Sequence, residues 1–87
     1  MTEKELERVY KAIANRRRIM IVRHLRSVRL STVGDIAGAI KLSYKATSRH
    51  LQVLAGAGYV IGDLQGPYMH YSLKPQSEIV KSVIRAM

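Results

Sequence analysis

Apolar residues recur at helical spacing along the first third of the chain. Residues 2–14 carry an apolar stripe at positions i, i+3, i+4 and i+7, which predicts an amphipathic helix. The members of this stripe are Leu6, Val9, Tyr10 and Ile13. Asn15 is a suitable cap for a second helix over residues 16–27, whose inward residues are Ile21, Val22 and Leu25.

A short third helix and a longer fourth helix follow, separated by a tight turn. Thr32 opens the third helix, and Ser43 caps a fourth helix over residues 44–56. The turn between them consists of Lys41 and Leu42. The inward residues of the third helix are Val33, Ile36, Ala37 and Ile40, and those of the fourth are Thr47, Leu51 and Leu54.

From Tyr59 onward the pattern becomes that of strands. Residues 59–63 and 68–73 are rich in aromatic and branched residues and predict a β-hairpin, with residues 64–67 as its turn. The connector over residues 28–31 has room for a short strand at Leu30 and Ser31. A last helix is expected over residues 75–86, because Pro75 is tolerated in a first turn. Its apolar stripe comprises Ile79, Val80, Val83, Ile84 and Met87.

This order of elements predicts a mainly α protein with a β-hairpin, a winged helix-turn-helix of order α-α-(β)-α-α-β-β-α. One domain spans residues 1–87, with the helix-turn-helix at 32–56 and the wing at 59–73. In this motif the second helix enters the major groove of DNA, while the first crosses the backbone. The terminal helices, residues 2–14 and 75–86, are then free to mediate dimerisation.

The charge balance indicates a polyanionic partner. The 87 residues contain 15 Lys and Arg against 6 Asp and Glu, a net charge of +9, and 47% are hydrophobic. Double-stranded DNA is the first candidate partner and an anionic membrane the second. No run approaches the ~18 apolar residues of a membrane span, and the start lacks the pattern of a secretory signal. We therefore expect a cytoplasmic protein with no membrane partner.

Three segments resemble the ArsR/SmtB family of transcriptional regulators. They are AIANRRRIMIVRHL, STVGDIAGAIKLSYKATSRHLQVLAGAGYV and GPYMHYSL, and the SRHLQVL…GYV portion is the most telling. The resemblance implies a dimeric DNA-binding repressor whose first and last helices form the subunit interface. The apolar stripes of these helices supply the expected interface residues: Leu6, Val9, Tyr10, Ile13, Ile79, Val80, Val83 and Ile84. The alternative is that the two stripes pack only on each other within one chain.

The chain departs from the family pattern at two places. Metal-sensing members carry a Cys-x-Cys pair in the third helix or Asp and His clusters in the last helix. Residues 32–36 hold no Cys or His, the last helix offers only Glu78, and the chain has no cysteine. We therefore predict no metal site and no cofactor. The wing tip, residues 63–67, also lacks the basic residues that the family often has there.

The fourth helix carries the expected DNA contacts. Its broad polar face comprises Tyr44, Lys45, Ser48, Arg49 and Gln52, with His50 beside it. Arg and Lys donate to guanine, Gln pairs with adenine, and Ser contacts a base or a phosphate. The alternative is an ordinary solvated helix face. Thr32 and Ser43 are expected first as helix caps, with phosphate contact as a secondary role.

Other candidate residues have structural interpretations. Arg18 faces inward and is expected to bind backbone carbonyls or a buried carboxylate, whereas Arg16 and Arg17 are expected to be exposed. The three histidines show no metal-ligand spacing and are expected to be structural. The wing tyrosines are expected to pack on the helical core rather than stack on single-stranded nucleic acid; they are Tyr59, Tyr68 and Tyr71.

The sequence thus favours a sequence-specific transcriptional regulator, a dimeric repressor lacking the usual metal-sensing sites. The alternative is a non-specific architectural or nucleoid DNA-binding protein. A winged helix that binds only proteins fits the basic charge poorly, and an enzyme fits least, because no catalytic constellation is present. The sequence identifies no small-molecule effector. Only Lys45 and Arg49 of the 15 basic residues lie on the polar face of the fourth helix that is expected to contact DNA.

Overall fold

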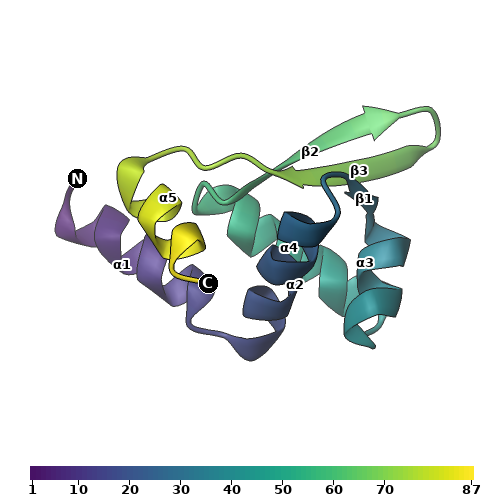
Figure 1. Ribbon diagram of the computed structural model, residues 1–87, viewed down its shortest axis with the longest axis horizontal. Coiled ribbons are helices and arrows are strands. Elements are labelled where there is room, and N and C mark those ends of the chain that lie inside the picture. The colour runs from purple at the N-terminus through teal and green to yellow at the C-terminus, as the bar shows by residue number, and fades with distance from the viewer.

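The computed structural model describes residues 1–87 as five helices and a three-stranded sheet (Figure 1). The elements in chain order are α1 (Glu3–Ile13), α2 (Arg16–Ser27), β1 (Ser31–Thr32), α3 (Val33–Ile40), α4 (Tyr44–Gly56), β2 (Val60–Gln65), β3 (Tyr68–Leu73) and α5 (Glu78–Arg85). The winged helix-turn-helix order predicted from the sequence is confirmed, including the short strand between α2 and α3.

Local sequence signals determine where the first helices begin. Thr2 accepts a hydrogen bond from the Glu5 amide, and the Glu5 carboxylate accepts from Thr2 in return, so the capping box is complete. Hydrogen bonds from the hydroxyl and the amide of Thr2 to the Glu5 carboxylate lower the pKa of this carboxyl below its usual value. Asn15 caps α2 by accepting from the Arg18 amide. The bounds of α2 and α4 agree with the sequence prediction.

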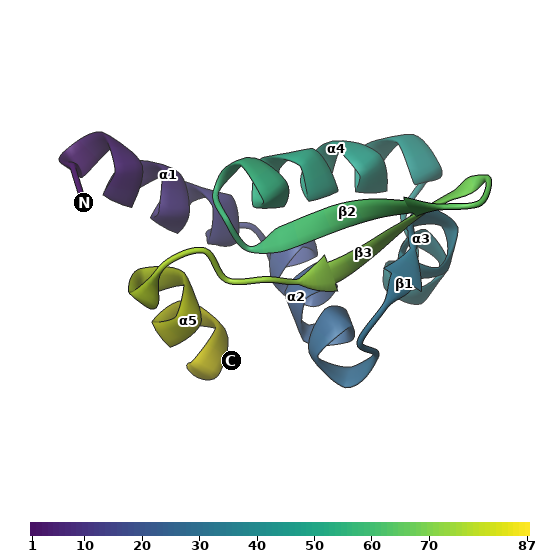
Figure 2. The same ribbon diagram turned by 90° about the horizontal axis from the view of Figure 1, so that it is seen from above.

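The sheet is small and antiparallel, in the order β1-β3-β2. Ser31 pairs with Tyr71, and Val60 pairs with Leu73 at the base of the hairpin. Figure 2 shows α4 on one side of the hairpin and α5 on the other. Both chain termini lie at the end of the molecule away from the hairpin tip (Figure 1).

A single apolar core joins all five helices to the base of the hairpin. It contains residues of α2, α3 and α4 together with Tyr59 and Val60. Val9 and Ala12 of α1 and Val80 of α5 also belong to it. The terminal helices are therefore anchored in the core of their own chain. The sequence interpretation had placed the apolar stripes of these helices mainly in an interface with a partner chain.

Several element boundaries differ from the sequence prediction. Helix α5 begins at Glu78 rather than at Pro75, because the side chain of Ser77 accepts from the Val80 amide and caps the helix. Strand β1 is shifted by one residue, to Ser31–Thr32. The hairpin strands extend to Gln65 and from Tyr68, so the turn is shorter than predicted. No helix is long and apolar enough to cross a membrane.

Candidate nucleic-acid interface

The outer side of α4 carries most of the polar side chains expected to contact DNA. Tyr44 is 62% exposed, and Lys45, Arg49 and Gln52 are also exposed, while Ser48 is half-buried. Thr47, Leu51 and Leu54 are fully buried on the opposite side of the helix. The structure thus places two cationic side chains and a carboxamide together on one solvent-facing surface. We call the residues Tyr44, Lys45, Ser48, Arg49 and Gln52 the reading face.

His50 lies beside the reading face but is held by the protein interior. It is half-buried, and its Nδ1 lies 3.2 Å from Nη1 of Arg18. Burial lowers the pKa of His50 below its usual value, and the charges of Arg18 and Arg17 add to this effect. The imidazole is therefore held in its neutral form, and its expected contact with phosphate stays a prediction.

Arg18 fastens α1 and α4 to α2. Its Nε donates to the carbonyl of Ala12 at 2.6 Å, and its Nη2 lies 3.4 Å from the carbonyl of Lys11. These carbonyls belong to the last turn of α1, where backbone carbonyls have no amide donor within the helix. The structural role expected for Arg18, the binding of backbone carbonyls, is confirmed.

The turn between α3 and α4 is built from a left-handed residue and a distant arginine. Lys41 has φ 56° and ends α3, and the amide of Leu42 donates to the carbonyl of Ala37 at 3.0 Å. Nη1 of Arg17 donates to the carbonyl of Ile40 at 2.7 Å. The expectation that Arg17 is exposed is therefore wrong, because its guanidinium satisfies the carboxyl-terminal end of α3.

Both predicted caps of the helix-turn-helix are present. The hydroxyl of Thr32 accepts from the amide of Asp35, and that of Ser43 accepts from the amide of Ala46, each at 3.1 Å. Ser43 is exposed at the amino-terminal end of α4, whereas Thr32 is half-buried and paired with His70 of β3. Of the two hydroxyls, Ser43 is the better placed to meet a phosphate.

The wing projects from the helical body (Figure 1). Its tip, residues 63–67, holds no basic residue. Gly66, with φ 61°, and Pro67 form its turn. Leu64 and Tyr68 are 65% and 63% exposed. The expected packing on the core is confirmed for Tyr59 and Tyr71, which belong to the core or pack against it. It is wrong for Tyr68, which is exposed next to the hairpin turn and is not part of the core.

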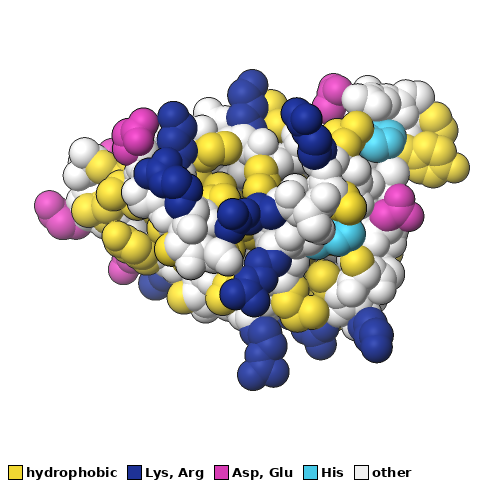
Figure 3. Space-filling view, in the orientation of Figure 1, with side chains coloured by type: hydrophobic (Ala, Val, Ile, Leu, Met, Phe, Trp, Pro, Cys, Tyr) yellow, Lys and Arg dark blue, Asp and Glu magenta, His cyan; other side chains and the backbone are white.

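Much of the positive charge lies away from the reading face. Figure 3 shows Lys and Arg side chains across the middle of one face, with acidic side chains toward its two ends. On α2 and the segment after it, Arg23, Arg26 and Arg29 are exposed. The two ion pairs of the chain join Lys11 to Glu7 and Lys81 to Glu78, so these arginines have no acidic partner.

The expected interface residues divide into three groups by exposure. Val9 and Val80 are 4% and 1% exposed and are buried within the single chain. Tyr10 is 53% exposed on α1. The half-buried members are Leu6, Ile13, Ile79, Val83 and Ile84. The surface that α1 and α5 offer to a partner is therefore narrower than the two stripes suggest.

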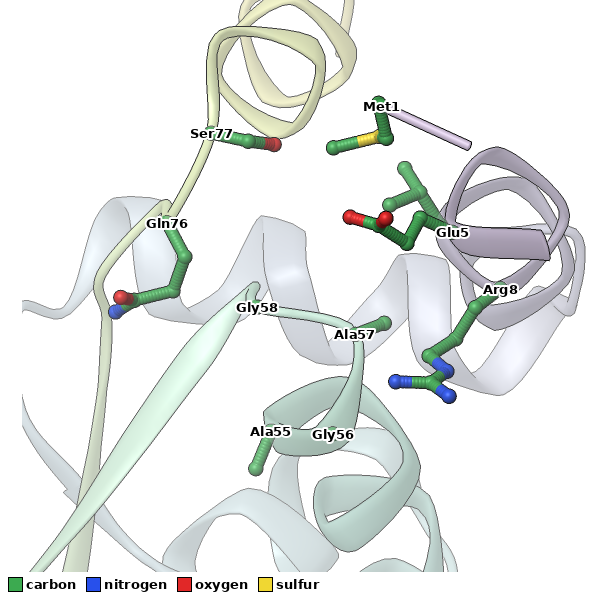
Figure 4. Close-up of a pocket in the computed structure, with 10 residues that line it drawn as sticks. Met1, Glu5, Arg8, Ala55, Gly56, Ala57, Gly58, Gln76 and Ser77 are labelled. Atoms are coloured by element: carbon green, nitrogen blue, oxygen red, sulfur yellow. The ribbon is translucent and has the colours of Figure 1, made fainter. Parts of the chain in front are cut away.

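Three hollows mark the surface, and none lies on the reading face. One, of about 440 Å³, lies between the start of α1, the end of α4 and the start of α5. There the Glu5 carboxylate and the Ser77 hydroxyl point into the space between α1 and α5, and Arg8 extends along its side (Figure 4). The chain holds no group of three or more His, Cys, Asp or Glu side chains placed to bind a metal ion.

Comparison with known proteins gives consistent results. Residues 15–61 match the family model "Bacterial regulatory protein, arsR family". Over 62 residues, 71% of this chain, the sequence is 42% identical to the HTH-type transcriptional regulator NmtR of Mycobacterium tuberculosis. The chain spans about half the length of that relative, 51% of it.

Two solved structures extend the likeness over nearly the whole chain. One is the homodimeric winged helix-turn-helix DNA-binding domain of a possible ArsR-family regulator from Mycobacterium bovis, at 29% identity and a TM-score of 0.82. The alignment covers 95% of this chain and 74% of that one. The transcriptional regulator HlyU from Vibrio vulnificus is 32% identical, with a TM-score of 0.77 over 95% of this chain and 83% of its own. With its family match, its relative and its fold in agreement, the chain belongs to the ArsR family of bacterial regulatory proteins.

Proposed function

We propose that the protein is a sequence-specific DNA-binding transcriptional regulator that acts in the cytoplasm as a dimeric repressor. The observation that carries this proposal is the reading face of α4. It combines exposed Lys45, Arg49 and Gln52 on the second helix of a helix-turn-helix. Neither cation is used in an ion pair within the chain.

The reading face has the chemistry that the major groove requires. Arg49 can donate two hydrogen bonds to O6 and N7 of guanine, and Gln52 can pair with adenine through N6 and N7. Ser43 at the start of α4 adds a hydroxyl and a helix amino terminus for phosphate. Base contacts then give specificity, and phosphate contacts fix the position of the helix on the duplex.

Dimerisation is supported by the apolar surface of α1 and α5 and by the homodimeric state of the Mycobacterium bovis domain. The proposed contact uses exposed Tyr10 together with half-buried Leu6, Ile13, Ile79 and Val83. A two-fold dimer reads an inverted repeat with half-sites about 34 Å apart. Such a protein represses by occupying a promoter.

We also propose that DNA binding is controlled without a metal ion on α3 or α5. The segment of α3 where metal-sensing members carry thiolates reads Thr32 to Ile36 here, with no Cys or His. DNA affinity is then expected to change less than twofold on addition of Zn²⁺ or Ni²⁺. A larger change that a chelator reverses contradicts this part of the proposal.

A non-specific architectural DNA-binding protein is the second candidate. The exposed arginines of α2, which lie outside the reading face, favour it. Phosphate neutralisation alone gives strong binding that depends little on sequence. The two candidates differ in whether one sequence is preferred at equal salt.

Selection of bound duplexes from a random pool, followed by a footprint, tests the proposal. A regulator enriches an inverted repeat and protects two half-sites one helical turn apart. Enrichment of no motif, with continuous protection along the duplex, supports the architectural role instead.

A further inference from the structure

We propose that the hollow between α2, β3 and α5 binds a small amphipathic anion, a carboxylate that carries a short apolar chain. The hollow measures about 440 Å³, within the range of roughly 300–1,000 Å³ of ligand pockets. Its lining residues are Leu25, Arg26, Arg29, Ser72, Leu73 and Ile84. We call the cavity lined by these six residues the anion hollow.

The charge of the anion hollow selects an anion. Arg26 and Arg29 contribute two guanidinium groups, Ser72 contributes a hydroxyl, and no acidic side chain takes part in the lining. Each guanidinium carries five N–H donors, and a carboxylate accepts two of them in parallel. Both ion pairs of the chain lie elsewhere, so neither arginine is neutralised by the protein.

One of the two arginines is held in place before any ligand arrives. Nη1 of Arg26 donates to the carbonyl of Ile84 at 3.0 Å, which leaves four of its donors free. A guanidinium held in this way loses less side-chain entropy on binding than a free one. Arg29, which makes no such bond, supplies the second donor group and can adjust to the ligand.

The remaining lining explains why the ligand should carry an apolar chain. Leu25 is 2% exposed and belongs to the core, and Leu73 and Ile84 pack against that core while staying half-buried. These three side chains form the apolar part of the lining, and the two arginines form its cationic part. A bare inorganic anion would leave the apolar part uncovered, whereas a short alkyl chain would be buried against it.

The position of the anion hollow separates it from the proposed DNA contact. Figure 2 shows α4 and α5 on opposite sides of the hairpin, and the anion hollow includes α5 but no residue of α4. A bound anion would join α5 to α2 and to the wing strand β3. Residues of three elements would then share one ligand.

The other cavities are less suited to such a ligand. The hollow near Glu5 and Arg8 contains a carboxylate as well as a guanidinium, and it includes Met1 (Figure 4). The third hollow, at Arg23 and Arg26, offers Met87 as its only apolar residue.

Titration of the free protein with hexanoate, followed by amide and Arg Nε NMR signals, tests this proposal without DNA. The outcome is therefore independent of whether the protein reads DNA. Hexanoate should shift the signals of the anion hollow in a saturable way. Acetate at equal concentration and ionic strength should bind more weakly because it lacks the chain, and hexanol because it lacks the charge.

Two variants with a matched control complete the test. Arg26→Gln and Arg29→Gln should each weaken hexanoate binding by roughly tenfold. Arg29→Gln removes no hydrogen bond of the folded chain, so its result holds even if Arg26→Gln disturbs α5. Arg16→Gln makes the same charge change at the far end of α2 and should leave binding unchanged.

Three outcomes would overturn the proposal. The first is equal binding of hexanoate to wild type and Arg29→Gln. The second is equal loss in Arg16→Gln, which indicates general charge attraction. The third is a set of shifts centred on Arg8, Gly58 and Gln76, which places the ligand in the hollow of Figure 4.

Discussion

Nη1 of Arg18 lies 3.2 Å from Nδ1 of His50 and so joins α2 to the helix that carries the reading face. Arginine can only donate, so Nδ1 accepts and the imidazole is neutral, with its proton on Nε2. The same guanidinium holds the Ala12 carbonyl at 2.6 Å. One side chain therefore links the end of α1 to α4, and its contact with α4 depends on the charge of His50.

Stability should fall in mild acid because of this contact. Burial in the folded protein lowers the pKa of His50 below its ordinary value of 6.5. The neutral form is favoured by folding, so the contribution is complete above pH ~6.5 and is lost as the pH falls below it. The slope is at most about 1.4 kcal/mol per pH unit and smaller here, because solvent screens the half-buried ring.

Urea unfolding from pH 7.5 to 5 measures this effect. The change with pH should be smaller in His50→Gln than in wild type. His70→Gln is the control, because the only side-chain hydrogen bond of His70 is with the carbonyl of Tyr68 within the wing. Equal pH dependence in wild type and His50→Gln would show that the contact adds nothing to stability.

Tyr59 should make the protein sensitive to strong alkali. Its hydroxyl donates to the carbonyl of Val9 at 2.8 Å. Burial, with a smaller effect of Tyr10, raises the pKa of Tyr59 to about 12. The unfolded value is about 10, so stability from the protonated phenol is present below pH ~10 and is lost as the pH rises toward 12.

Tyr59→Phe is the variant that isolates this effect. It should lower the free energy of unfolding at pH 7 by roughly 1–3 kcal/mol and show a weaker decline in alkali. Denaturant unfolding at pH 7, 10 and 11 compares the two proteins. An unchanged decline in Tyr59→Phe assigns the alkaline loss to other groups.

Lys41→Gly should stabilise the helix-turn-helix. Lys41 is the only non-glycine residue with positive φ, at 56°. A side chain in this region costs roughly 1–2 kcal/mol, and glycine avoids that cost, so a net gain of up to about 1 kcal/mol is expected. Thermal unfolding measures it.

Ala39→Gly is the matched control, because it puts the same residue inside α3. It should destabilise by roughly 0.5–1 kcal/mol. Equal losses in both variants would contradict the role given to the left-handed turn.

Tyr10→Glu should weaken the proposed dimer. Tyr10 is 53% exposed on α1, and a charge there would be desolvated against the partner. Sedimentation equilibrium should show a dissociation constant raised by at least roughly tenfold. Tyr68→Glu makes the same change at a 63% exposed site on the wing and should have no effect. Equal dimerisation of Tyr10→Glu and wild type would place the interface elsewhere.

Helix boundaries that depend on local capping residues and apolar spacing were predicted from the sequence. Residue 15 as a cap and the apolar spacing after it determine α2, and Ser43 does the same for α4, so both helices have the expected bounds. The start of α5 was misplaced because Pro75 and Ser77 are both acceptable near a first turn. Only the hydrogen bond from Val80 to Ser77 distinguishes them.

Features that depend on distant partners were not predicted. Arg17 donates a hydrogen bond to the carbonyl of Ile40, 23 residues away in the sequence, and no local sequence pattern predicts a hydrogen bond over that separation. Tyr68 and Tyr71 lie three residues apart and so face opposite sides of β3, and Tyr68 is 63% exposed next to the hairpin turn. The anion hollow likewise comes from three separate segments of the chain.

The most direct test of the central claim is equilibrium binding to the selected duplex and to a scrambled duplex of equal length and salt. Wild type should prefer the selected site by at least about 10³-fold. Arg49→Ala should lose roughly 1–3 kcal/mol on the selected site and little on the scrambled one. Arg23→Ala is the same substitution at an exposed position of α2, and it should change the affinity for both duplexes by the same amount. Equal affinity of wild type for the two duplexes, or an Arg49→Ala protein that binds like wild type, would contradict a reading role for α4.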